Sequence, residues 1–132
     1  MEKLKRIRIG EKRYPYKIDL NVLEQIQEEY GSINKFERDI LGYVFEKDRE
    51  GNQIYTKDGK PLMRRTEPSV RAIKAVLPAA INEGLAIEAD ETGKEFEPVA
   101  EEQIFRECKI AYETLADMMH EEFTRCFVIK KR

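Results

Sequence analysis

The chain has 132 residues, of which 38% are charged, and its formal net charge is −2. This length favours one domain over residues 1–132, and so small a net charge excludes a protein that binds polyanions through its overall field. No apolar run approaches the ~20 residues of a membrane-spanning helix, and the N-terminus MEKLKRIRIG lacks the apolar stretch of a secretion signal, so we expect a soluble intracellular protein.

Two segments at the N-terminus are typical of β-strands. Lys3–Ile9 alternates apolar and basic residues, and Arg13–Ile18 follows as its partner. Between them, residues 10–12 (GEK) supply a turn in which Gly10 is free to adopt a positive φ. Pro15 has no amide proton to donate, which places the second strand at a sheet edge. The sequence therefore predicts a two-stranded hairpin with basic side chains.

Two amphipathic helices are predicted next. We expect Asn21 to cap the first, because Glu24 lies at the capping-box spacing, and Gly31 to end it. The second is expected to begin at Ser32 and end at Gly42. Their apolar stripes recur at helical spacing and consist of Val22, Leu23, Ile26 and Tyr30, then Ile33, Phe36, Ile40 and Leu41.

Residues 43–65 break the helical pattern. The short pieces YVFEK, QIYTK and PLMRR are typical of strands, and DREGN and KDGK between them are turn signals. We interpret this segment as an exposed β-meander inserted between helices.

The third helix is predicted to be the most buried one. Thr66 is expected to cap it, Pro68 to lie in its first turn, Pro78 to kink or divide it, and Gly84 to end it. Residues 85–99 are then expected to form a loop or a second hairpin. The apolar stripe of this helix consists of Val70, Ile73, Leu77 and Ile81.

The longest periodic run extends from Ala100 to about Phe127 and predicts one long amphipathic helix. At ~1.5 Å per residue it would span roughly 40 Å, against a radius of gyration of ~14 Å for a globule of this size. We therefore expect one end to project or to pack against another subunit. Cys108 and Cys126 would lie roughly 27 Å apart on it and are expected to be reduced thiols. Residues 128–132 are expected to be a frayed basic tail.

The sequence contains no recognisable catalytic motif. The single histidine, His120, lacks the second histidine of an H-E-x-x-H zinc site, and no glycine-rich phosphate loop is present. Ser32 and Ser69 are both explained as helix starts. We predict neither enzymatic activity nor a metal or other cofactor.

The charges are unevenly distributed along the chain. The first 17 residues are rich in Lys and Arg, whereas residues 88–102 are rich in Asp and Glu. The N-terminal basic side chains alternate with Tyr14 and Tyr16, a pattern that suits stacked bases and phosphates, although solvated strand residues give the same pattern. A nucleic-acid-binding accessory protein is therefore an alternative, which the overall acidity disfavours.

Two segments resemble the tail assembly chaperone family of long-tailed phages and prophages of Gram-positive bacteria. They are DLNVLEQIQEEYGS (Asp19–Ser32) and LPAAINEG (Leu77–Gly84) with its acidic sequel. The resemblance implies a non-enzymatic protein of the host bacterial cytoplasm that binds the tape measure protein before the tail tube polymerises around it. It also implies self-association. A structural tail component that stays in the virion is a further alternative.

Within this hypothesis, two apolar stripes are candidates for binding a helical partner, although ordinary core residues would give the same stripes. They consist of Leu23, Ile26 and Tyr30 and of Phe105, Tyr112, Leu115, Met119 and Phe123. Basic and acidic surfaces of opposite sign are candidates for contacts between subunits in a ring or spiral, and consist of Arg6, Arg8 and Arg13 and of Glu24 and Glu28. The predicted fold is an α+β domain with a small N-terminal sheet and about four helices.

Overall fold

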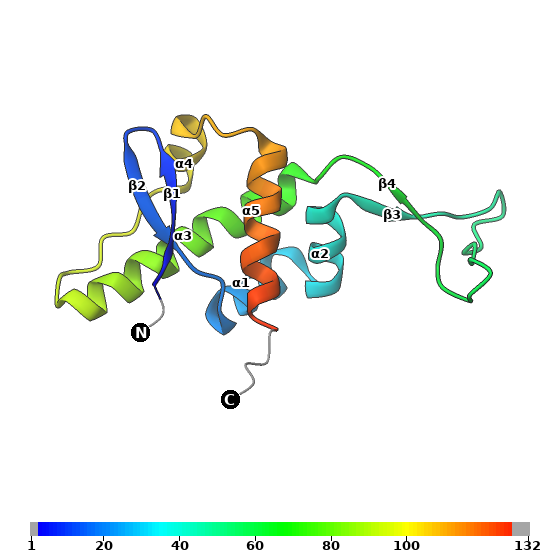
Figure 1. The fold of residues 1–132 in the computed structure, drawn as a ribbon, viewed down its shortest axis with the longest axis horizontal. Coiled ribbons are helices and arrows are strands. Elements are labelled where there is room, and N and C mark those ends of the chain that lie inside the picture. The colour runs from blue at the N-terminus through cyan, green and yellow to red at the C-terminus, as the bar shows by residue number, and fades with distance from the viewer. Residues whose placement is uncertain (1–2, 128–132) are drawn as a thin grey trace.

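The N-terminal hairpin forms as its alternating pattern predicts. In the computed structural model, which describes residues 3–127, strands β1 (Lys5–Ile9) and β2 (Lys12–Tyr16) pair antiparallel (Figure 1). Gly10 adopts a φ of 64° in the turn between them. One face of the hairpin is buried in the core and carries Ile7, Ile9, Tyr14 and Tyr16. The tail 128–132 lies outside the described residues.

Helices α1 (Leu20–Tyr30) and α2 (Ile33–Leu41) follow, and three of their four predicted ends are confirmed. Ser32 caps α2, and Gly31 and Gly42 are the C-caps of the two helices. The predicted cap at Asn21 is wrong, because the Asp19 carboxylate accepts the hydrogen bond from the Val22 amide instead. Asn21 lies inside α1, where its side-chain amide donates to Glu83 of the next long helix at 2.9 Å.

Helix α3 (Val70–Thr92) is the longest helix that the structure describes, and it differs from its prediction at both ends. Ser69 rather than Thr66 caps it, because the Ser69 hydroxyl accepts from the Ala72 amide at 3.2 Å. Pro68 then lies just before the cap. The helix is not divided at the buried Pro78, and it continues through Gly84, so residues 85–92 are helical and the predicted loop or hairpin there is wrong.

Gly84 is required by a close approach between β2 and α3 rather than by a helix end. A Cβ atom at this position would lie 2.6 Å from the carbonyl carbon and oxygen of Pro15. Two residues further along, the Lys17 amide donates to the Ala80 carbonyl at 3.0 Å, which joins the end of the hairpin to the helix. The missing side chain lets the strand backbone lie directly on α3.

The C-terminal periodic run forms two helices, α4 (Glu101–Glu107) and α5 (Tyr112–Arg125), so the prediction of one long helix is wrong. Cys108 has extended backbone angles, and the Glu107 carbonyl accepts a hydrogen bond at 3.1 Å from Gly10 in the hairpin turn. The distance predicted between the cysteines assumed one helix and no longer applies. Neither cysteine is in a disulfide, and both are partly buried.

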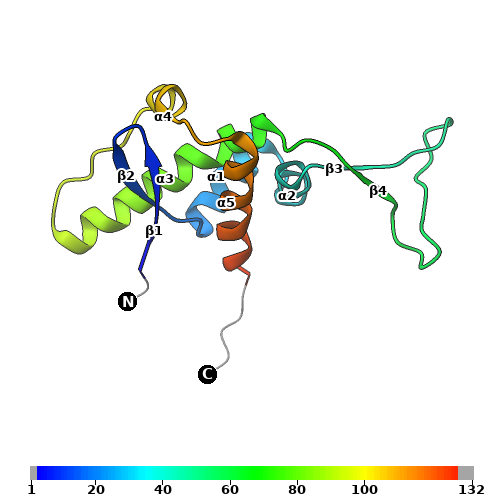
Figure 2. The ribbon, with the colours of Figure 1, turned by 45° about the horizontal axis from the view of Figure 1, so that its top comes forward.

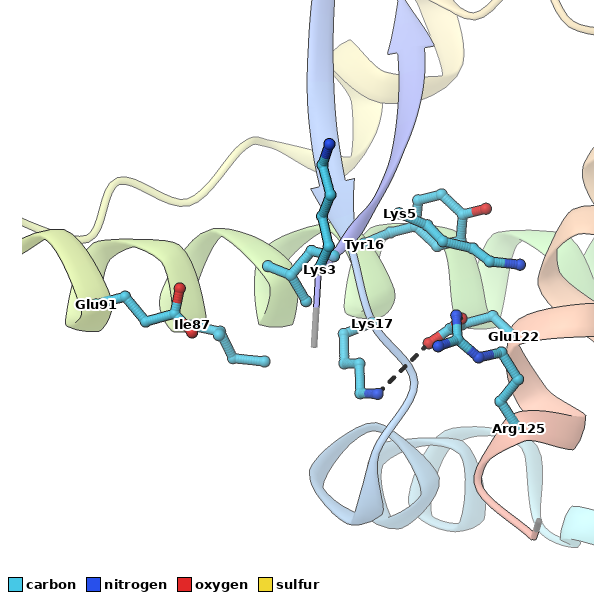
Figure 3. A pocket seen from close by; sticks show the side chains of 9 residues that line it. Lys3, Lys5, Tyr16, Lys17, Ile87, Glu91, Glu122 and Arg125 are labelled. Carbon is cyan, nitrogen blue, oxygen red and sulfur yellow. Dashed lines mark hydrogen bonds and ion pairs between the residues drawn. The ribbon is translucent and has the colours of Figure 1, made fainter. Parts of the chain in front are cut away.

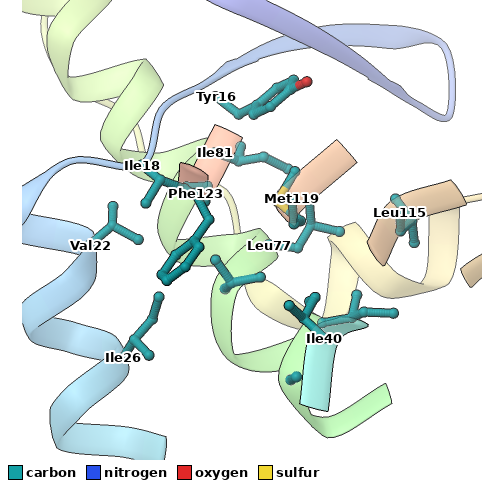
Figure 4. Packing of buried hydrophobic residues seen from close by; sticks show 14 of the residues in the cluster. Tyr16, Ile18, Val22, Ile26, Ile40, Leu77, Ile81, Leu115, Met119 and Phe123 are labelled. Carbon is teal, nitrogen blue, oxygen red and sulfur yellow. The ribbon is translucent and has the colours of Figure 1, made fainter. Parts of the chain in front are cut away.

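Within the described part of the chain, the hairpin and helices α1 to α5 contribute to one hydrophobic cluster, which confirms the α+β class. Figure 4 shows how side chains of β2, α1, α2, α3 and α5 pack in it. Helix α5 packs against α2 and α3, and α1 packs against α3. Phe36 is fully buried, with the rings of Tyr30 and Phe123 centred 5.8 and 5.5 Å from its own. The described residues therefore form a helical body with a small sheet on one side.

An arm of residues 43–65 extends from this body (Figures 1 and 2). Strands β3 (Tyr43–Phe45) and β4 (Met63–Arg65) pair at its base, and isolated bridges join Lys47 to Gln53 and Tyr55 to Pro61 further out. The prediction of a β-meander is confirmed for the pairing of the first and last pieces, YVFEK and PLMRR. The middle piece, QIYTK, contributes only isolated bridges and forms no strand. The hydrophobic core contains no residue of the arm.

Candidate partner-binding surface

Most of the residues predicted to bind a helical partner are core residues. Six of the eight side chains are at most 6% exposed, so the prediction that they form a surface is wrong, and their apolar stripes serve the ordinary packing of α1 and α5. These six are Leu23, Ile26, Tyr30, Leu115, Met119 and Phe123. Phe105 and Tyr112 are half-buried and remain accessible.

Phe105 and Tyr112 line a groove of about 260 Å³ between the start of α3 and the α4–α5 connection. The groove exists because the chain leaves helical geometry after Glu107, so that the extended connection supplies a wall. Val70 is 54% exposed at its edge. The amino group of Lys74 lies 5.4 Å from the centre of the Phe105 ring. The groove lining consists of Val70, Ile73, Lys74, Phe105, Cys108, Ile110, Tyr112 and Leu115.

A second accessible apolar surface lies at the base of the arm and was missed by the sequence analysis. A hollow of about 400 Å³ is bordered by α2 and by Tyr43, Phe45 and Met63 of the β3–β4 pair. Phe45 is 38% and Met63 48% exposed, and the Arg38 guanidinium lies 4.6 Å from the centre of the Phe45 ring. The only sequence signal was a set of large apolar residues within a segment rich in turns.

The charged residues predicted to join subunits are only partly available. Arg6 forms an ion pair with Glu88 of α3, so this charge is compensated inside the molecule. Arg8 donates from its Nε to the Gly10 carbonyl at 3.3 Å. Arg13, Glu24 and Glu28 are exposed. Arg6 is thus partly compensated within the molecule, and a contact between subunits through these charges stays a prediction.

The basic hairpin lacks the aromatic surface that the nucleic-acid alternative requires. Tyr14 and Tyr16 are 8% and 4% exposed because they lie on the core face of the hairpin, opposite Arg6, Arg8 and Arg13. Lys5 pairs with Glu121 at 2.8 Å, and Lys17 lies 3.8 Å from Glu122. Strand alternation separates both rings from the three arginines, and burial leaves neither ring accessible for a base to stack on.

Glu122 is a buried carboxylate that connects α5 to the segment between β2 and α1 (Figure 3). It accepts from Arg125 at 2.9 Å and lies 3.5 Å from the Ile18 amide. Burial, together with the negative charges of Glu122 and Glu121, raises the pKa of Tyr16. Burial likewise raises the pKa of the Cys126 thiol, which donates to the Ile18 carbonyl at 2.6 Å. Tyr16 and Cys126 therefore hold their protons more tightly than free side chains do, and Glu122 and Cys126 both contact the backbone of Ile18.

His120 lies beside a carboxylate but not in a cluster of metal ligands. Its Nε2 is 3.0 Å from Glu37, which joins α5 to α2. Among residues 3–127, no group of three or more His, Cys, Asp or Glu side chains is arranged to hold a metal ion. In the same part of the chain, no helix combines the length and the apolar character needed to cross a membrane.

No protein-family model, curated protein or solved structure matches this chain. In the sequence, Met63 of the hollow and Val70 of the groove lie on either side of residues 66–69, which connect β4 to α3.

Proposed function

We propose that this protein is a non-enzymatic tail assembly chaperone of a long-tailed phage or prophage, which binds and solubilises the tape measure protein in the host bacterial cytoplasm. The groove of Phe105 and Tyr112 carries this proposal. It is an accessible apolar site on a folded body, of the kind that accepts the apolar side chains of an amphipathic helix.

The partner's chemistry follows from the lining of the groove. An apolar side chain of the partner helix would pack against Phe105, Ile110 and Tyr112, and acidic residues beside it would face Lys74 at the edge. A long helical protein with apolar stripes offers many such segments. Binding them one at a time would cover the surfaces through which the unassembled partner aggregates.

Self-association of the chaperone is part of the proposal. Arg8 and Arg13 of the hairpin and Glu24 and Glu28 of α1 are exposed and opposite in sign, which supports pairing between neighbouring subunits. The weaker contribution of Arg6, which is paired within the molecule, is compatible with the remaining charges making this contact.

Co-expression with the long, helix-rich protein of the neighbouring open reading frame tests the proposal. We expect the partner to become soluble and to co-purify with this chain. Phe105→Asp and Val70→Asp should abolish co-purification because each places a charge at the groove. Leu20→Asp is the matched control, since Leu20 is 81% exposed on α1 outside the groove.

Two outcomes would favour the alternatives. An insoluble partner, together with a salt-dependent shift of DNA or RNA that is lost on reversing Arg6 and Arg8, would favour a nucleic-acid-binding accessory protein. Detection of this protein in purified virions would favour a structural tail component, because a chaperone is expected to leave the assembled tail.

A further inference from the structure

A second hollow lies at the end of the molecule opposite the arm. It has a volume of about 380 Å³ and lies between β2, the end of α3 and residues 93–100. Its apolar floor includes Leu85, Ala89 and Val99, and three carboxylates border it, those of Glu95 and Glu97 and that of Glu88, which is paired with Arg6. Lys12 and Lys94 also line it. We call it the acidic hollow.

The wall of the acidic hollow is held in place by a pair of hydrogen bonds. The Asn82 amide oxygen accepts from the Val99 amide at 2.8 Å, and its amide nitrogen donates to the Val99 carbonyl at 3.2 Å. The Lys94 amide also donates to the Ala89 carbonyl at 3.0 Å. A wall fixed in this way lowers the entropic cost of binding.

The arm carries the complementary chemistry. Its returning half, residues 57–65, has four basic residues and one acidic residue, a net charge of +3. The segment 88–97 beside the hollow has five acidic residues and one lysine, a net charge of −4, and Glu95 and Glu97 are its acidic residues that line the hollow without a partner inside the described chain. Every residue from 57 to 65 is exposed, and Leu62 and Met63 are 37% and 48% exposed. The arm therefore presents apolar side chains flanked by cations.

The arm cannot reach the acidic hollow of its own chain, because the end of α3 and residues 93–100, which form the hollow, lie at the opposite end of the molecule from the arm in both views (Figures 1 and 2). We propose that the arm of one copy docks in the acidic hollow of a second copy, with Leu62 and Met63 on the apolar floor and Lys57 and Lys60 facing Glu95 and Glu97. Because the two surfaces differ, the contact is heterologous and generates a ring or a filament.

This contact differs from the pairing of hairpin and α1 charges described above, and it does not depend on the identity of the chaperone's client. The purified protein alone therefore tests it. If the arm did not dock in the hollow, the proposal that the groove binds the tape measure protein would still stand. If the groove did not bind that protein, the contact between arm and hollow would still stand.

Sedimentation velocity of three full-length variants is the experiment. The arm variant carries Lys60→Gln, Leu62→Gln and Met63→Gln, and the hollow variant carries Glu95→Lys and Glu97→Lys. The control variant carries Glu113→Lys and Asp117→Lys, the same charge change on exposed positions of α5 that lie outside the arm and the acidic hollow. We expect wild type and control to self-associate at ~50 mM salt and less so at ~500 mM, and the arm and hollow variants to associate at least about 30-fold more weakly.

Mixing the arm and hollow variants is the decisive step. The mixture has one intact arm and one intact hollow, so the two variants should associate with each other more strongly than either does alone. A wild-type protein that stays monomeric at both salt concentrations, or variants that associate like wild type, would overturn the proposal. So would monomeric wild type that binds a single-stranded oligonucleotide through the arm, which would assign the arm to nucleic acid instead.

Discussion

Replacing Gly84 with alanine should destabilise the protein, although alanine is the better helix former. Gly84 lies within α3, where intrinsic propensity alone would make alanine more stable by roughly 1 kcal/mol. The added Cβ would however lie 2.6 Å from two backbone atoms of Pro15 and 2.8 Å from the amide nitrogen of Tyr16. Ordinary contact distances are about 3.5 to 4 Å, so β2 would have to move by about 1 Å.

The cost of that movement is large because the obstructing atoms belong to the backbone and the hairpin carries core side chains. Overpacking of this kind costs about 3 kcal/mol, which leaves a net loss of about 2 kcal/mol in the free energy of unfolding. For a domain of this size that corresponds to a Tm lowered by about 8 °C. Differential scanning calorimetry of Gly84→Ala measures it.

Asp90→Ala is the matched control for this measurement. Asp90 is exposed on the same helix, so its substitution should change the Tm by no more than about 2 °C. A Gly84→Ala variant with an unchanged or raised Tm would refute the reasoning, because it would mean that helix propensity outweighs the contact with β2.

Three further predictions concern a buried phenol, a buried carboxylate and the arm. Burial and a hydrogen bond to Asp39 raise the pKa of Tyr30 to about 12; the folded state therefore holds this proton more tightly than the unfolded state, and stability should fall as the pH rises from about 10 toward 12. Urea unfolding across this range should show a smaller fall in Tyr30→Phe. Glu122→Gln should lower the free energy of unfolding by about 2 kcal/mol in the same assay, because it removes the buried charge with which the half-exposed Arg125 forms an ion pair. An unchanged free energy of unfolding would contradict a stabilising role for this ion pair. Replacing residues 47–61 by an Asn-Gly turn should leave the Tm within about 2 °C of wild type, since no core residue is removed, whereas a large fall in calorimetry would show that the arm supports the body.

The parts of the fold that depend on local signals were predictable. The alternation of apolar and basic residues predicted the hairpin. Ser32 predicted the start of α2, and the glycines at 31 and 42 predicted the ends of α1 and α2. These signals act within one turn of the residue concerned, so they survive in any tertiary context. At α1 two candidate caps lay two residues apart, and the backbone selected Asp19 over Asn21.

The errors arose where a distant segment decided the outcome. A glycine at position 84 is typical of a helix end. The residue is instead glycine because the backbone of Pro15, which is far away in the sequence, leaves no room for a Cβ atom there. The break after Glu107 contains neither glycine nor proline, and the hairpin turn takes the Glu107 carbonyl that a continuous helix would have used. The helical spacing of apolar residues continues across this break, so the spacing alone could not reveal that the helix is interrupted.

The candidate site was only partly predictable for a related reason. An apolar stripe indicates that a helix face is covered, but not whether the cover comes from the same chain or from a partner. The core covers Ile26, Met119 and Phe123, whereas Phe105 and Tyr112 are left at the edge where α4 and α5 separate. That edge exists only because of the helix break that the sequence did not reveal.

The central claim is that the groove of Phe105 and Tyr112 holds the tape measure protein in a soluble form. The most direct test is the soluble fraction of that protein when it is co-expressed with wild type, with Phe105→Asp or with the control Leu20→Asp. We predict a largely soluble partner with wild type and with the control, and a pellet with Phe105→Asp, although all three chains remain folded by circular dichroism. Equal solubility with folded Phe105→Asp and with wild type would contradict the claim.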